Sequence, residues 1–213
     1  MTDDTLLIPL VPARRSAYAT QAPSGLLLAD TRLRRTGPAD PVGSTLTEAL
    51  ADHEERLGLR PHGSAGLLEL VDEAGLTGHG GAHVPAVLKW RSVLRGHGPL
   101  TVVANGAESE PIAAKDGTLL RQRPHLVLDG LEILAETLGA QRAVLWLHGD
   151  DDGARRSVER ALAERHGPGH LQAPHGFREA VRRVPGVRGE IVSGPSHYLS
   201  GEASAIVRAL SGG

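Results

Sequence analysis

The chain has no cysteine among its 213 residues. This absence excludes disulfide bonds, cysteine nucleophiles and any cysteine-ligated iron–sulfur cluster on this chain. Aromatic residues are also scarce, at 2% of the composition, so few rings are available for stacking against a base or a planar cofactor. The hydrophobic core must therefore be built from Leu, Val, Ile and Ala.

The chain also lacks an excess of positive charge and a long apolar run. Its formal net charge is −2, and the short arginine clusters are interpreted as solvated surface, so no nucleic-acid partner is expected. The N-terminus begins Met-Thr-Asp-Asp, which is acidic where a signal peptide is basic. No stretch approaches the roughly 18 apolar residues of a membrane helix. We expect a cytoplasmic protein without membrane insertion.

Residues 1–60 are predicted to form an irregular and partly helical N-terminal extension. Two short apolar runs, 6–11 and 26–28, could be edge strands. A helix is predicted from Thr45, because Thr45-Leu-Thr-Glu48 matches a capping box and apolar residues follow at helical spacing.

Residues 61–213 are predicted to form an α/β domain. Helices are expected at 65–73 and 85–94, and the hydrophobic period changes after them. Three apolar strands, at 100–104, 143–147 and 189–193, then alternate with helices at 125–138, 155–165 and 202–210. Because parallel strands need helical crossovers, the fold class is α/β with a Rossmann-like parallel sheet flanked by helices.

A glycine-rich loop, Gly78-His-Gly-Gly81, separates the first two helices of this domain. Its glycines allow backbone N–H groups to turn toward a ligand, and Lys89 lies one turn into the following helix. The loop is not a Walker A motif, and it is not the Rossmann fingerprint because a helix precedes it. A structural joint and a ligand site both remain open on this evidence.

His79 and His83 are four residues apart, which is a spacing used by metal ligands on a helix. The glycines around them argue against a helix, and no third ligand is fixed by spacing. No metal site is predicted.

Two polar turns occur beside predicted strands and helices. The turn 105–111 follows a buried strand, at the carboxyl end where open α/β sheets bind ligands. The turn 198–202 leads into the last helix. Each turn alone is equally consistent with a polar surface loop.

Four segments together resemble a known family. Residues 75–90 are similar to the signature Gly-Leu-Arg-Gly-Arg-Gly-Gly-Ala-Gly-Phe-Pro-Thr-Gly-Leu-Lys-Trp of the flavin subunit of NADH:quinone oxidoreductase (respiratory complex I). Residues 102–116 resemble its Val-Cys-Asn-Ala-Asp-Glu-Gly-Glu-Pro-Gly-Thr-Phe-Lys-Asp. Residues 124–130 and 198–212 resemble its Pro-His-Leu-Leu-Ile-Glu-Gly and Tyr-Ile-Cys-Gly-Glu-Glu-Thr-Ala-Leu-Leu-Asn-Ser-Leu-Glu-Gly. The four segments follow one another along the chain in the same order as in the family.

This resemblance implies that residues 61–213 form an FMN-binding domain, with NADH or NADPH stacked over the flavin. It assigns the glycine loop to the cofactors, Lys89 to the flavin, Asn105 and Glu108 to hydrogen bonds with the flavin, and Glu110 to NADH. The turn 198–202 would complete the wall of the pocket that holds the cofactors. The implied cofactor-binding residues are Gly78, His79, Gly80, Gly81, Lys89, Asn105, Glu108, Glu110, Tyr198, Gly201 and Glu202. No catalytic side chain is implied, because the cofactors carry the hydride transfer.

The implied function is an NADH dehydrogenase-type oxidoreductase that moves hydride from NADH to FMN and passes electrons to an iron–sulfur partner. That acceptor would be a ferredoxin or a partner subunit in a hetero-oligomer, since the family's ubiquitin-like and iron–sulfur domains have no counterpart before Gly213. The alternative is a flavin-free, non-catalytic relic that acts as an interaction or assembly module. Three departures favour it: Val84 replaces a Phe, Ala107 an Asp and Ala203 a Glu of the family pattern.

Overall fold

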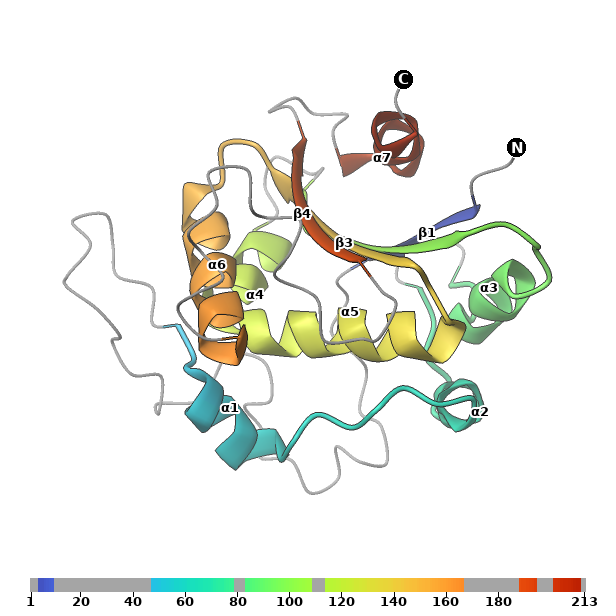
Figure 1. The fold of residues 1–213 in the computed structure, drawn as a ribbon, viewed down its shortest axis with the longest axis horizontal. Coiled ribbons are helices and arrows are strands. Elements are labelled where there is room, and N and C mark those ends of the chain that lie inside the picture. The colour runs from blue at the N-terminus through green and yellow to red at the C-terminus, as the bar shows by residue number, and fades with distance from the viewer. Residues whose placement is uncertain are drawn as a thin grey trace.

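The fold is built on a four-stranded parallel sheet (Figure 1). The computed structural model describes residues 4–9, 47–78, 83–108, 114–166, 188–194 and 201–211. The strands are β1 (Asp4–Pro9), β2 (Leu100–Asn105), β3 (Arg142–His148) and β4 (Arg188–Gly194), and they lie in chain order. Because each strand pairs with the next one along the chain, the strand order does not reverse within this sheet.

The helices cover the two faces of the sheet unequally (Figure 1). One face carries α4 (Lys115–Gln122), α5 (Pro124–Leu138) and α6 (Asp152–His166), with α1 (Leu50–Leu57) packed outside α5 and α6. Two short helices, α2 (Gly66–Glu73) and α3 (Ala86–Val93), precede β2. The opposite face carries α7 (Ala203–Leu210). No helix in the described part of the chain is long and apolar enough to cross a membrane.

Successive side chains of a strand point to opposite faces of the sheet, so the core is divided between these two faces. The larger cluster lies under α4, α5 and α6 and includes Val102, Leu128 and Leu145. The smaller one, called here the α7-face cluster, consists of Val103, Ala107, Val144, Trp146 and Ile206. Strands covered on both faces are apolar throughout, which is why β2 and β3 are continuous apolar runs in the sequence. The predicted α/β fold class is confirmed.

Most elements lie within a few residues of their predicted positions, but α4 was not predicted. Its sequence, Lys-Asp-Gly-Thr-Leu-Leu-Arg-Gln, contains a glycine and little apolar periodicity. Gly117 packs closely there, since a Cβ at this position would lie 2.9 Å from a carboxylate oxygen of Asp151. Close packing of α4 on α6 therefore overrides the low helix propensity of glycine.

The predicted capping box of the first helix is wrong. The helix α1 begins at Leu50 after Ala49, whereas the Glu48 side chain is buried and bonds Arg123 and Arg56. Its buried residue is His53, while Leu57 is 41% exposed. The helix therefore packs through polar contacts, which hydrophobic periodicity cannot detect. Thr45 and the run 26–28 lie outside the described residues.

Two elements that precede residue 60 contact the rest of the fold. The strand β1 pairs with β2 along its whole length, so the run 6–11 does contribute an edge strand. The helix α1 contacts α5 and α6. The division of the chain at residue 60 stays a prediction.

Candidate functional site

The carboxyl ends of β2, β3 and β4 meet at one edge of the sheet. Asn105, His148 and Gly194 each end a strand, and each lies two residues after a side chain that belongs to or packs on the α7-face cluster. Alternation therefore places all three on the face covered by α7. This carboxyl edge is where a parallel sheet offers its ligand site.

Asn105 joins two turns that are far apart in the sequence. Its Nδ2 donates a hydrogen bond to the carbonyl of Gly201 at 2.8 Å, and its Oδ1 accepts one from the Ala107 amide at 3.1 Å. Gly201 is buried and lies directly before Glu202 and α7. The structure thus brings together the turn after β2 and the turn before α7, as expected for a shared site.

Two glycines allow the chain to approach Trp146 closely at this edge. The Gly106 amide donates to the Trp146 carbonyl at 2.8 Å, and a Cβ there would lie 2.6 Å from the Leu120 side chain. A Cβ on Gly194 would lie 2.3 Å from the indole ring. Both positions require glycine for packing reasons, so the edge has a fixed shape.

Glu108 uses both of its carboxylate oxygens within the protein. Lys115 Nζ donates to Oε1, and the backbone amide of Asp116 donates to Oε2 at 2.9 Å. Burial by itself would raise the pKa of Glu108, but these hydrogen bonds outweigh it and hold the pKa below its usual value. The predicted flavin contact of Glu108 therefore has a competitor inside the chain.

Asp116 is a buried carboxyl beside Glu108. Lys115 Nζ donates to its Oδ2 at 2.9 Å. Burial raises the pKa of Asp116 to about 6; Lys115 opposes this rise, and the negative charge of Glu108 adds to it. One lysine thus bridges two carboxyl groups at the start of α4.

The glycine loop is closed at its base by the backbone. The Gly78 amide donates to the Val84 carbonyl at 2.9 Å, and Thr77 and Pro85 form an antiparallel bridge. Lys89 is exposed on α3 and its side chain approaches Gly78: a Cβ on Gly78 would lie 4.0 Å from Lys89 Nζ. A cation beside this glycine suits an anionic group such as a phosphate.

The predicted site residues therefore fall into two described groups. One consists of Gly78 and Lys89, and the other of Asn105, Glu108, Gly201 and the exposed Glu202. Among the described residues, no hydrogen bond or ion pair links Lys89 to Asn105 or Glu108. The other predicted residues, His79, Gly80, Gly81, Glu110 and Tyr198, lie outside the described part.

Sequence reasoning missed three polar residues at this edge. Lys115 and Asp116 close the segment 102–116 on which the family resemblance rests, so the motif itself could have identified them. His148 ends β3, and its Nδ1 lies 3.1 Å from Asp150 Oδ1. Its position at the end of a predicted apolar strand was the available signal.

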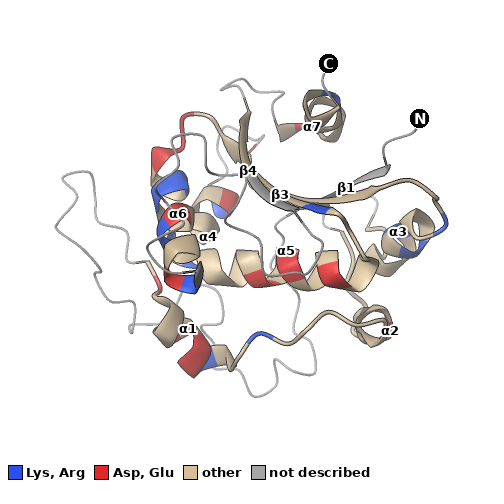
Figure 2. Ribbon diagram, viewed as in Figure 1, with Lys and Arg blue, Asp and Glu red and all other residues tan. Residues whose placement is uncertain are grey.

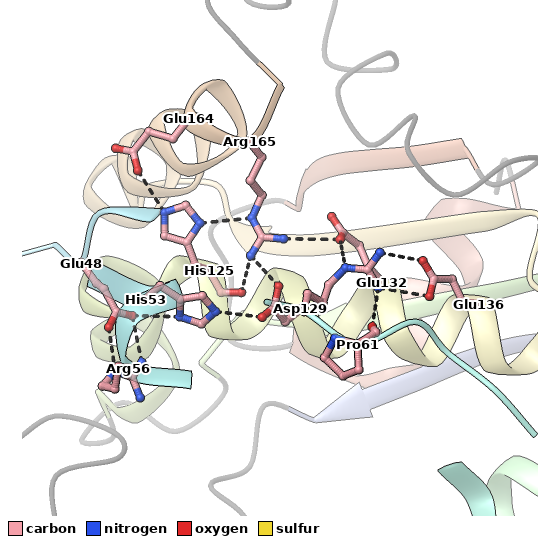
Figure 3. A network of polar contacts seen from close by, with 11 residues as sticks. Glu48, His53, Arg56, Pro61, His125, Asp129, Glu132, Glu136, Glu164 and Arg165 are labelled. Atoms are coloured by element: carbon pink, nitrogen blue, oxygen red, sulfur yellow. Dashed lines mark hydrogen bonds and ion pairs between the residues drawn. The ribbon is translucent and has the colours of Figure 1, made fainter. Parts of the chain in front are cut away.

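A second polar cluster lies in the helix layer (Figure 3). His53 of α1 lies between two carboxylates, 3.2 Å from Glu48 Oε2 and 2.8 Å from Asp129 Oδ2. Burial would lower the pKa of His53, but the two carboxylates raise it above its usual value. The imidazolium therefore joins α1 to α5.

His125 stands 5.6 Å from His53, ring to ring, in the opposite protonation state. Arg165 Nε donates to its Nδ1 at 3.1 Å, so the proton of the neutral ring is on Nε2, which donates to Glu164. Burial lowers the pKa of His125, and Arg165 lowers it further against the effect of Glu164.

This cluster is structural. Glu164 also accepts the Leu50 amide at 2.8 Å, which fixes the first turn of α1 to α6. Figure 2 shows that acidic residues recur along α5, and two of them, Glu132 and Glu136, bind Arg60 in the segment after α1. The contacts of the cluster link helix to helix, and the carboxyl edge remains the candidate functional site.

The chain is similar to proteins of one known family. Residues 71–213 match the family model described as the Nuo51 FMN-binding domain. An NADH-quinone oxidoreductase subunit of Rhizobium meliloti is 33% identical over 150 residues, which are 68% of this chain and 34% of that protein. Its counterparts in Streptomyces coelicolor and Aquifex aeolicus are 30% and 28% identical, each over 68% of this chain and over 32% and 33% of the relative. The chain spans about a third of the length of these curated relatives.

Proposed function

Because the chain belongs to the family of Nuo51 FMN-binding domains, we propose that it binds FMN at the carboxyl edge of its sheet. We propose further that it does so as the flavin domain of an NADH-oxidising oxidoreductase within a hetero-oligomer. In that assembly the electrons would pass to an iron–sulfur partner, since the chain has no cysteine to ligate a cluster of its own.

One observation carries this proposal. The hydrogen bond from Asn105 to Gly201 joins two of the family segments, 96 residues apart, at the ends of parallel strands. Two loops held together there, beside the first turn of α7, form the kind of edge at which α/β sheets bind nucleotides. An unrelated function would not require these two segments to meet.

The residues present fit a flavin mononucleotide in their chemistry. Lys89 beside Gly78 offers a cation and an unhindered backbone to a phosphate. Asn105 and Glu108 are engaged within the protein, so they shape the edge and hold its loops in place. When bound, FMN would accept hydride and release electrons one at a time, so the chain need only bind, orient and exclude water.

The described residues support flavin binding more strongly than NADH binding. Ala107, which stands where the family pattern has Asp, is buried in the α7-face cluster and offers no polar atom to a nucleotide. Ala203 likewise replaces an acidic residue at the start of α7. Loss of two acidic groups leaves less negative charge near the nucleotide, so NADPH and NADH are both candidate donors.

A titration of the purified chain with FMN tests the proposal. Binding should quench flavin fluorescence and shift its absorption bands. Lys89→Met should weaken the complex by about tenfold, which is the usual scale for one charge-assisted contact. Arg91→Met is the matched control, because it removes a cation from the same helix that pairs instead with Asp72.

The outcomes separate the two functional hypotheses. Quenching that depends on Lys89 but not on Arg91 supports the flavin domain. Anaerobic bleaching on adding NADH or NADPH then identifies the electron donor. Absence of any spectral change at millimolar FMN would leave the flavin-free assembly module as the better account of this chain.

A further inference from the structure

We propose that Lys115 and Asp116 are positioning residues of the flavin site, which hold Glu108 and the turn after β2 against the first turn of α4. The inference deepens the proposed function and rests on it. It assigns a role to two residues that need not touch the cofactor themselves.

Hydrogen bonds hold two residues of this turn, Asn105 and Glu108, in place. Asn105 Oδ1 accepts the Ala107 amide, and the next residue, Glu108, is bound by Lys115 and by the Asp116 amide. Two residues of the polar turn after β2 are therefore held by other segments: Asn105 by Gly201, which lies just before α7, and Glu108 by the start of α4. A carboxylate at the N-terminus of α4 also interacts favourably with the helix dipole.

Lys115 is the group that makes this arrangement possible. Two carboxylates, Glu108 and the buried Asp116, face the same ammonium group, and without it they would repel each other. Among the described residues, Arg121 and Asp151 also lie beside Gly117 of α4, and they form their own ion pair at 2.8 Å. They do not replace the charge of Lys115.

Lysine is rare in this chain. The sequence contains 21 arginines and only two lysines, Lys89 and Lys115. Both are in segments that resemble the flavin subunit.

A double-mutant cycle on FMN affinity tests the inference. Glu108→Gln and Lys115→Met should each weaken FMN by about tenfold. Since Lys115 acts through Glu108, the double variant should also be about tenfold weaker than the wild type. Lys115→Arg keeps the charge and should restore most of the affinity. Arg95→Met, which removes an exposed cation near the start of β2, serves as the control.

The cycle gives distinct answers for the two proposals. If the wild type does not bind FMN, the proposed function fails. If it binds FMN but the two losses multiply to about a hundredfold, Lys115 acts independently and only the positioning role is overturned. An unchanged affinity in Lys115→Met overturns it as well.

The pH dependence of Asp116→Asn provides a second readout that a merely structural residue would not change. The ratio of wild-type to variant FMN affinity cancels the titration of the FMN phosphate, which is common to both. Because the pKa of Asp116 is raised to about 6, this ratio should be near one at pH 5 and should depart from one by pH 7. A ratio that does not vary over this range contradicts the inference.

Discussion

The substitution Glu48→Gln tests how the helix layer is held together. Glu48 is buried at 2% exposure and accepts hydrogen bonds from Arg123 at 2.6 Å and from Arg56 at 2.8 Å. Its other oxygen lies 3.2 Å from His53. Glutamine keeps the shape of the side chain but leaves three cationic groups facing a neutral amide.

The expected loss follows from the proton affinity of this carboxyl. Burial would raise the pKa of Glu48, but hydrogen bonds from His53 and Arg56 and the charge of Arg123 lower it from 4.5 to about 2. A shift of this size corresponds to about 3 kcal/mol, at 1.36 kcal/mol per pKa unit. Breaking a buried ion pair costs about 3–5 kcal/mol in general, so the two figures agree.

The sign of the pH dependence is fixed by the lowered pKa. The stabilisation is fully present above pH 4.5 and is lost as the pH falls toward 2. The difference in stability between the wild type and Glu48→Gln should therefore be constant from pH 7 to about pH 5 and shrink below that. A difference that grows on acidification would contradict the assignment.

Urea unfolding followed by circular dichroism measures this difference. Glu69→Gln on α2 is the matched control, since Glu69 is exposed and 3.8 Å from Arg91, and such a pair contributes roughly 0–1 kcal/mol. A loss below about 1 kcal/mol in Glu48→Gln would refute the reasoning, because the charge of Glu48 would then not hold α1 in place.

Two glycine-to-alanine substitutions are expected to differ because their surroundings differ. Gly194→Ala places a methyl group against the Trp146 indole and should destabilise the chain by about 1–3 kcal/mol, with a changed near-ultraviolet spectrum. Gly130→Ala in α5 meets no atom within 4 Å and should be neutral or stabilising, so equal losses in both variants would contradict the packing argument.

The sheet could be predicted from the sequence because its strands are buried on both faces. β2 and β3 are uninterrupted apolar runs between turn residues, and this pattern leaves few alternatives. The helix α4 has no such pattern, and it forms because Gly117 and Leu120 pack against neighbours supplied by other segments. The local sequence of α4 does not indicate which distant residues will pack against it.

The polar cluster around His53 was not predictable for the same reason. Its partners Asp129 and Glu48 are 76 and 5 residues away, and the first of these contacts exists only once α1 packs on α5. A helix that buries a histidine and exposes Leu57 violates the apolar periodicity on which its prediction depends. The false capping box has the same origin, since Glu48 is used in the core.

The candidate site was predictable in part, through family resemblance and not through local pattern. Asn105 and Gly201 do meet, and Lys89 does lie beside Gly78. The internal engagement of Glu108 by Lys115 and Asp116 could not be predicted from spacing, because it depends on the path of the turn between them.

The most direct test of the flavin site is chemical footprinting of the two lysines. Acylation of the chain, followed by mass spectrometry, reports Lys89 and Lys115 separately because no other lysine is present. The proposed site predicts that saturating FMN slows acylation of Lys89, whereas uridine monophosphate at the same concentration has a smaller effect because it lacks the flavin ring. Equal acylation of Lys89 with and without FMN would contradict the placement of the cofactor beside the glycine loop.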